Sequence, residues 1–200
     1  VKNMLIATER LLLRPFVEAD AAEVYAYLKE PAVRCFASMK LHSLDEARAE
    51  MRRRREEAEF HLAITLQENG AVIGEIEALP EAGDPHAQED AILDTFSPCW
   101  MLHPAYQGKG YAFEAAQAFL DYLFRDKGAR RIYAYVEDDS LASQRLCERL
   151  GMRREGLFLE FVSFVKQPDG TPLYENTLQY AILKREWERR NGYAAPVCSL

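Results

Sequence analysis

One glycine-rich stretch decides how the fold is assigned, and it reads Leu102-His103-Pro104-Ala105-Tyr106-Gln107-Gly108-Lys109-Gly110-Tyr111-Ala112. It opens into an amphipathic segment that we expect to be a helix over 109–125, with no acidic residue in its first turn. A helix N-terminus presents unpaired backbone N–H groups and the positive end of the helix dipole, which attract anions. Glycines let a phosphate approach the main chain without a Cβ in the way. The stretch therefore predicts a phosphate-binding turn.

Single residues of this stretch argue against two common classes of glycine-loop site. A nucleotide-binding P-loop has Ser or Thr after its Gly-Lys pair, but here Gly110 follows Lys109. A dinucleotide-binding fingerprint has a small residue where this chain has Phe113, and it follows the first strand, not a late one. The remaining alternative for so short a motif is a solvent-facing turn that only caps a helix.

The composition indicates one globular domain. The 200 residues are 48% hydrophobic and 28% charged, which allows one sizeable core, and no apolar run is long enough to cross a bilayer. The N-terminus has no apolar signal-peptide segment, so we expect a cytoplasmic protein with no membrane partner. The net charge of -7 argues against nucleic-acid binding and favours a cationic substrate. The four cysteines have no CxxC spacing, so no metal site is expected.

Hydrophobic periodicity and turn residues predict alternating strands and helices. Asp20 and Ser43 are expected to cap two helices, and Ser140 or Ser143 a later one that Gly151 ends. The expected strands cover 11–14, 60–66, 72–78, 96–102, 131–136, 157–165 and 177–183. Hairpin turns are expected at 69–70 and 168–170, a loop at 83–90, and a break in the strand 96–102 at Pro98, which cannot donate to a ladder.

A run of four arginines, Arg52 to Arg55, is the most basic segment. It is followed by glutamates at 56, 57 and 59, three and four residues away, which is the spacing at which a helix pairs its charges. We therefore interpret the run as a solvated helix face and not as a nucleic-acid contact.

The Gln-x-x-Gly-x-Ala pattern at Gln107, Gly110 and Ala112 resembles the pyrophosphate-binding motif of the GNAT superfamily of N-acetyltransferases. Further blocks are similar in order and spacing to its RimJ/RimL-like branch, from about residue 8 to 187. They are TERLLLRP at 8–15, YQGKGYAFEA at 106–115, Ala142-Ser143, ERLGM at 148–152, Glu155-Gly156, LQYAIL at 178–183 and Glu186-Trp187.

The resemblance implies a GNAT fold of the α/β (α+β) class. This is a mixed, mostly antiparallel central sheet of about seven strands flanked by about four helices, with a splayed V between strands four and five. We expect a single acetyltransferase domain over 1–190 and a loose tail over 191–200. The resemblance is also compatible with a homodimer.

The resemblance further implies acetyl-CoA as co-substrate and an amine as acceptor. The residues expected to bind the cofactor are those of the turn and of the strand and helix beside it: Met101, Leu102, Gln107, Gly108, Lys109, Gly110, Tyr111, Ala112 and Ser140. A backbone N–H near Leu102 would polarise the thioester carbonyl.

The chain departs from the family pattern at positions that bear on catalysis and acceptor recognition. Ser140 stands where the family has Asn, and Cys147 stands where many members have the Tyr that protonates the leaving thiolate. Leu159 and Asn176 stand where the branch often has Arg and Asp. The resemblance therefore says least about how this chain recognises its acceptor.

The catalytic residues have to be chosen by chemistry. The amine must lose a proton to attack, which requires a carboxylate or a water chain. The candidate bases are Glu77, Asp94 and Glu160, and Ser143 is the candidate acid, with helix capping as its alternative role. We expect direct transfer to a primary amine, either a protein N-terminus or a small molecule, because no paired nucleophile and base is recognisable. The alternative is a non-catalytic acyl-CoA-binding or sensing domain, favoured by the missing Asn and Tyr.

Overall fold

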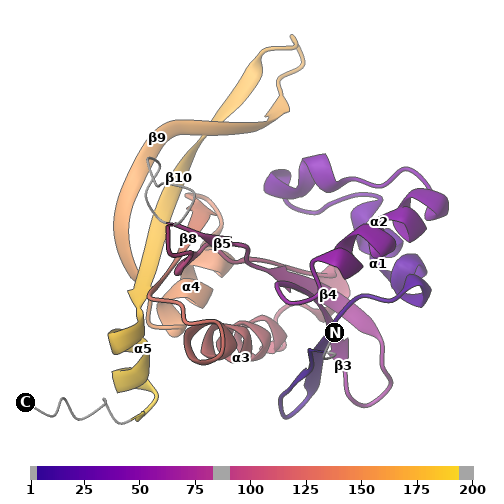
Figure 1. Ribbon diagram of the computed structural model, residues 1–200. Helices are drawn as coiled ribbons and strands as arrows, with labels where there is room; N and C mark the ends of the chain where they lie inside the picture. The colour runs from indigo at the N-terminus through magenta and orange to yellow at the C-terminus, as the bar shows by residue number, and fades with distance from the viewer. Residues whose placement is uncertain (1–3, 83–90, 194–200) are drawn as a thin grey trace, which may run out of the picture.

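Two β-sheets carry the fold, and they diverge from each other in the middle of the molecule (Figure 1). The computed structural model describes residues 4–82 and 91–193. The first sheet has the order β1 (Ile6–Ala7), β2 (Leu11–Arg14), β3 (His61–Leu66), β4 (Val72–Glu77) and β7 (Cys99–Leu102). The second has the order β5 (Pro80–Glu81), β6 (Thr95–Phe96), β8 (Arg131–Glu137), β10 (Pro172–Leu183) and β9 (Arg153–Lys166). The mixed, mostly antiparallel architecture is confirmed, but as two sheets and not one.

The sheets separate where the predicted strand 96–102 breaks. Its first part, β6, pairs in parallel with Arg131 and Ile132 of β8, whereas its second part, β7, pairs antiparallel with β4. Ser97 and Pro98 lie between the two parts, and proline has no N–H with which to continue a ladder. From Tyr133 onward β8 pairs only with β10 within the described ranges, so a V opens between β7 and β8.

Helices cover both faces of the first sheet, so two hydrophobic cores form. The helices are α1 (Ala21–Leu28), α2 (Leu44–Glu56), α3 (Tyr111–Arg125), α4 (Leu141–Arg149) and α5 (Lys184–Arg190), with 3-10 turns η1 (Glu18–Asp20), η2 (Arg34–Met39) and η3 (Pro104–Tyr106). Because strand side chains alternate between faces, Ala63 joins the core of α1, η2 and α2, while Leu62 and Ile64 join the core of α3 and α4. The helix α5 was not predicted.

The predicted helix caps at Ser43 and Asp20 have different outcomes. Ser43 is confirmed, because its Oγ accepts the Glu46 N–H at 3.1 Å. The prediction that the Asp20 side chain caps α1 is wrong. Its carboxylate accepts hydrogen bonds from Nη1 and Nη2 of Arg14, both at 2.8 Å, and from the Val17 N–H at 2.9 Å. The chain already turns in η1 before α1 begins, so the carboxylate is directed back to Arg14.

The arginine run of α2 is only partly solvated. Arg53 makes an expected pair with Glu57, at 3.5 Å, and a closer one with Glu50, at 2.6 Å, that was not predicted. Arg54 contradicts the prediction, because its side chain is fully buried and its Nη1 lies 2.5 Å from Oε2 of Glu75 on β4. Arg54 is the residue of the run that faces the sheet, and the spacing of the glutamates did not reveal it.

Both predicted hairpins are confirmed, and the second is longer than expected. The first turns at Gly70, whose φ is 76°, and joins β3 to β4. The second joins β9 to β10 through Gly170, whose φ is 88°, and extends well beyond the body of the molecule (Figure 1).

The loop predicted at 83–90 and the tail from 194 lie outside the described residues. Tyr193 continues from α5, and its N–H donates to Glu188 O at 2.9 Å. Across the described chain, every helix is too short or too polar to span a membrane.

Candidate functional site

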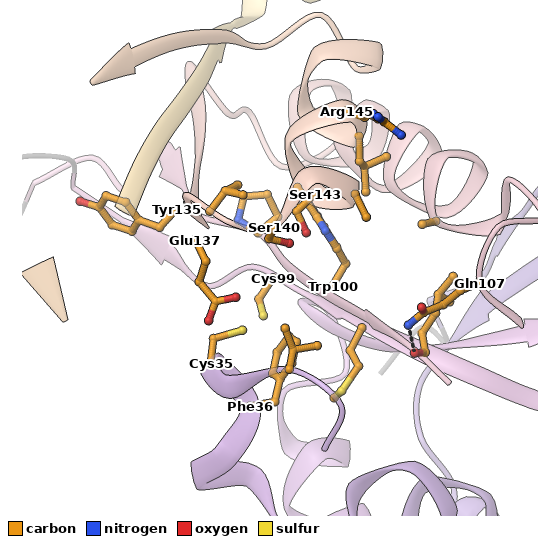
Figure 2. A pocket seen from close by; sticks show the side chains of 18 of the residues that line it. Cys35, Phe36, Cys99, Trp100, Gln107, Tyr135, Glu137, Ser140, Ser143 and Arg145 are labelled. Carbon is orange, nitrogen blue, oxygen red and sulfur yellow. Dashed lines mark hydrogen bonds between the residues drawn. The ribbon is translucent and has the colours of Figure 1, made fainter. Parts of the chain in front are cut away.

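A cavity of about 680 Å³ lies in the V between β7 and β8. At one end it is lined by the glycine turn and the first turns of α3 and α4. At the other end it is lined by η2, the end of β8 and the hairpin strand β9 (Figure 2). We refer to these as the glycine end and the β9 end.

The glycine turn presents free backbone donors at the start of α3. Gly108 and Gly110 have φ angles of 75° and 84°, the left-handed region that favours glycine. The first helix N–H with a protein acceptor is that of Glu114, which bonds Gly110 O at 3.1 Å. The N–H groups of Tyr111, Ala112 and Phe113 precede it and have no acceptor among the described residues. This arrangement fits a bound diphosphate.

Glu114 corrects the expectation that the first turn of this helix holds no acidic residue. The helix begins at Tyr111 and not at Lys109, which brings Glu114 into the first turn. Its carboxylate accepts from Thr8 Oγ1 at 2.6 Å and from the Arg10 backbone N–H at 2.8 Å, and it forms an ion pair with the Arg10 guanidinium. The charge is thus neutralised beside β2.

The end of β7 offers a second set of backbone groups to a ligand. Met101 and Leu102 pair with β4 on one edge only, and their other edge borders the cavity. Gln107, expected to bind the cofactor, lines the cavity and donates from Nε2 to Leu102 O at 3.2 Å (Figure 2). That bond holds the glycine turn against the strand. Lys109 does not line the cavity, and its Nζ lies 5.3 Å from the centre of the Tyr106 ring.

The helix α4 contributes hydroxyls and two cations to the glycine end. Ser140 is its N-cap residue but makes no capping bond with its side chain, and Ser143 lies in its first turn; both line the cavity. Cys147 faces the core instead. Arg145 and Arg149 also line the cavity, and sequence analysis did not single them out. Their spacing of four residues on a predicted helix is the signal that could have placed both on one face.

The three carboxylates predicted as bases are not among the described residues that line the cavity. Asp94 is held by Arg130 Nε at 2.9 Å. Glu160 is exposed on β9 with φ of 48°, and its N–H bonds Asn176 Oδ1 at 3.0 Å. Glu77 faces Nδ1 of His61, at 3.2 Å. The structure therefore places none of these three carboxylates at the cavity wall, because strand position alone did not reveal which carboxylates reach the V.

Glu137 is the carboxylate that the sequence analysis missed. It is the last residue of β8, it is 9% exposed, and it lines the β9 end of the cavity. Burial raises its pKa above the ordinary glutamate value, and the nearby charge of Glu175 adds to the effect. In Figure 2 its carboxylate points toward η2 and the Cys35 side chain. The predicted strand stopped at 136, one residue short of it; the acidic run 137–139 after that strand was the available signal.

The thiols near the cavity are poor nucleophiles. Burial raises the pKa of Cys35 to about 12 and that of Cys147 to about 12, and it also raises the pKa of Cys99. The thiolate is the reactive form of cysteine, so these side chains are unreactive at neutral pH. The observation agrees with a transfer that uses no covalent cysteine intermediate.

A V between two sheets, with free helix donors at one end and a buried carboxylate at the other, is an arrangement that can hold a phosphorylated ligand and support proton transfer beside it. The model of the Acetyltransferase (GNAT) domain family matches residues 10–153. The chain therefore belongs to the GNAT family of acetyl-CoA-dependent acetyltransferases.

Relatives and solved structures agree with this assignment. The chain is 31% identical to the uncharacterized N-acetyltransferase YnaD of Bacillus subtilis, over 92% of this chain and 99% of YnaD. It is similar to the crystal structure of a GNAT-family acetyltransferase from Bacillus anthracis, with 28% identity, a TM-score of 0.75, and coverage of 92% and 100%. It shares the fold of the microcin C7 self-immunity acetyltransferase MccE, solved with acetyl-CoA and AMP, at 14% identity, a TM-score of 0.67, and coverage of 88% and 93%.

The glycine turn can be tested with two matched substitutions. The substitution Gly110→Ala forces a residue with a side chain to keep the left-handed backbone angle of Gly110. The added Cβ also lies 3.4 Å from Arg10 Nη2. Because this strains the turn, we expect the Kd of coenzyme A, measured by calorimetry, to rise by about tenfold. Gly170→Ala imposes a comparable strain at the open tip of the β9–β10 hairpin, where nothing lies within 4 Å. Equal CoA affinities in the two variants would contradict a phosphate site at the turn.

Proposed function

We propose that this protein transfers the acetyl group of acetyl-CoA directly to a primary amine, with Glu137 as the general base. One observation carries the proposal: the cavity holds a turn with free backbone donors at one end and, at the other, a buried carboxylate whose Oε1 has no hydrogen-bond partner among the described residues. Gly108, Gly110, Tyr111 and Ala112 would bind the diphosphate. The free edge of β7 at Met101 and Leu102 would bond the pantetheine arm and place the thioester in the V.

The proposed reaction needs one base, one acid and a donor to the oxyanion. Glu137 accepts a proton from the bound ammonium, and the free amine nitrogen then forms a bond to the thioester carbon. A backbone N–H near Leu102 stabilises the oxyanion of the tetrahedral adduct. The adduct nitrogen then loses its second proton through water, and the carbon–sulfur bond breaks. The thiolate of coenzyme A leaves with a proton from Ser143 or from water, and where Ser143 gives it, the proton released by the nitrogen restores the hydroxyl. The proton that Glu137 took passes to solvent. The raised pKa of Glu137 suits it to this role, since it makes the carboxylate a stronger base.

A thiol-release assay tests the proposal. The protein is incubated with acetyl-CoA and a panel of primary amines, free coenzyme A is measured, and the acetylated amine is identified by mass spectrometry. We expect amine-dependent release of coenzyme A with one acetyl group added to the amine nitrogen. Binding of acetyl-CoA without release in the presence of any amine would favour the alternative, a non-catalytic acyl-CoA-binding domain.

We also infer a place in the RimJ/RimL-like branch. Support comes from the residue blocks quoted above and from likeness to the ribosomal-protein-S5-alanine acetyltransferase of Vibrio fischeri, with a TM-score of 0.68 and coverage of 92% and 98%. The identity is 14%, so the likeness concerns the fold and does not transfer that enzyme's acceptor. The acceptor has to be argued from this chain's own cavity.

A further inference from the structure

We propose that the acceptor is a monoamine whose amino group is carried on an apolar body, aromatic or alkyl. This inference rests on the proposed N-acetyltransferase function and concerns the β9 end of the cavity, where the acceptor would bind. It follows from two properties of that end of the cavity: how many charges it can neutralise, and what covers its walls.

One carboxylate reaches the wall of the cavity at the β9 end. Among the described residues that line the cavity, Glu137 is the only carboxylate. Glu175 lies behind it and is 8% exposed, but its Oε1 is 2.5 Å from Nε of Arg34. The same guanidinium also holds Asp139, with Nη2 at 2.7 Å from Oδ2. One bound ammonium would therefore pair with Glu137, whereas a second would find no further carboxylate on the wall of the described cavity.

The walls around Glu137 are largely apolar and include several aromatic side chains. The aromatic side chains that line this end come from four separate elements: Phe36, Trp100, Tyr135, Phe161 and Phe164. Tyr135 and Phe161 pack with ring centroids 5.4 Å apart, and Phe36 is almost fully buried. In Figure 2 Phe36 is seen on the side of Cys35 and the Glu137 carboxylate, and Trp100 beside Ser143. A ligand that carries its amine on a hydrocarbon or aromatic group would bury apolar surface on every side.

The positions of the cations argue against an acceptor that carries a carboxylate. Arg145 and Arg149, the arginines that line the described part of the cavity, both lie on α4 at the glycine end. Arg34 does not line the cavity and is already paired with Glu175 and Asp139. An amino acid bound with its amine at Glu137 would therefore place its own carboxylate among aromatic rings, without a free positive partner. Burying an unpaired charge in such surroundings is strongly unfavourable. The acceptor is therefore a simple amine and not an amino acid.

Two pairs of amines of similar size test this inference through kcat/KM in the thiol-release assay. Hexylamine and 1,5-diaminopentane have the same number of heavy atoms, but the diamine replaces the terminal methyl by an ammonium. 2-Phenylethylamine and phenylalanine differ by one carboxylate. We expect the first member of each pair to be favoured by at least about tenfold, because the second buries an unpaired charge. A tetrapeptide with a free N-terminus should be a poorer substrate than 2-phenylethylamine.

A matched pair of variants tests the charge count independently. Phe161→Glu places a second carboxylate in the cavity, and we expect it to shift the ratio of kcat/KM for the diamine over hexylamine upward by at least about tenfold. Leu159→Glu adds the same charge two residues away on β9, at a position that is 71% exposed and does not line the cavity. This control should leave the ratio unchanged.

The outcomes separate this inference from the function on which it rests. Turnover that favours the diamine, phenylalanine or the peptide would overturn the monoamine inference and leave the acetyltransferase proposal intact. Equal shifts of the ratio in Phe161→Glu and Leu159→Glu would also overturn it, because general surface charge would then explain selectivity. Absence of thiol release with every amine would overturn the proposed function itself, and the monoamine inference with it.

Discussion

Replacing Glu137 by glutamine is expected to lower kcat/KM for the amine by about 10²- to 10⁴-fold, which is the usual contribution of a general base. Glutamine has nearly the same shape as glutamate but cannot accept the proton that the ammonium must lose. The Kd of acetyl-CoA should stay unchanged, because Glu137 lies at the β9 end of the cavity and the glycine turn at the other end. The measurement is thiol release at saturating acetyl-CoA.

The natural control for this variant is Glu160→Gln. Glu160 is one of the three carboxylates proposed as bases from the sequence, but it is exposed and does not line the cavity. We expect near-normal kcat/KM in Glu160→Gln. A large loss of kcat/KM in Glu160→Gln, with Glu137→Gln still active, would show that Glu160 is the base and that the assignment of Glu137 is wrong.

The pH dependence gives an independent test of the same role. The base must be ionised to work, and burial raises the pKa of Glu137 above the ordinary glutamate value. Activity should therefore fall as the pH drops through this raised pKa, at a higher pH than an exposed glutamate would produce. In Glu137→Gln that acid limb of the kcat/KM profile should disappear. An unchanged acid limb in the variant would assign it to another group.

Loss of folding cannot explain a loss of activity in Glu137→Gln. A carboxyl group whose pKa is raised on folding binds its proton more tightly in the folded chain, so its ionisation lowers the free energy of unfolding as the pH rises. Removing the charge should therefore leave the free energy of unfolding at pH 7 unchanged or higher. Denaturant unfolding of both proteins checks this point.

The parts of the site that could be predicted from sequence are those with local chemistry. The glycine turn is visible because Gly108 and Gly110 must adopt backbone angles that few other residues tolerate, and because a helix follows directly. The break at Pro98 is visible because proline lacks an N–H. Both features depend on a few adjacent residues, so their spacing carries the information.

Glu137 could not be predicted in the same way, because its properties come from distant segments. It is buried only when η2 and β10 close over the end of β8, and its pKa is raised partly by Glu175, which lies on β10. Arg54 is a second example, since only the packing of α2 against β4 separates it from its solvated neighbours. In both cases the tertiary structure determines whether a charged residue is exposed, and the spacing of residues in the sequence does not reveal its burial.

Arg54→Met is expected to lower the free energy of unfolding by about 3–5 kcal/mol, the usual cost of breaking a buried ion pair. The Arg54 side chain is fully buried, and Glu75 accepts from its Nη1 at 2.5 Å and from Tyr27 Oη at 2.7 Å. Methionine keeps most of the apolar stem but leaves the Glu75 charge without its main partner. The measurement is urea unfolding at pH 7.

Arg52→Met is the matched control, two residues earlier on the same helix. Arg52 is 61% exposed and its Nη1 is 3.5 Å from Oε1 of Glu18, also 61% exposed. Exposed pairs contribute less than about 1 kcal/mol, so this variant should unfold almost like the original protein. Equal losses in the two variants would mean that the loss of Arg54 acts through helix propensity and not through the buried pair.

The pH dependence distinguishes a charge effect from a packing effect in Arg54→Met. Burial alone would raise the pKa of Glu75, but His61 and Arg54 outweigh it and lower the pKa to about 2. A carboxyl group with a lowered pKa stabilises the fold above its ordinary pKa, and this stabilisation is lost as the pH falls toward about 2. The difference in free energy of unfolding between original and variant should therefore be largest near neutral pH and shrink on acidification, whereas a packing defect would persist at every pH.

The double variant Arg54→Met/Glu75→Gln, which removes both charges, should recover much of the lost free energy of unfolding at pH 7. If it is no more stable than Arg54→Met, the buried charge of Glu75 is not the source of the instability.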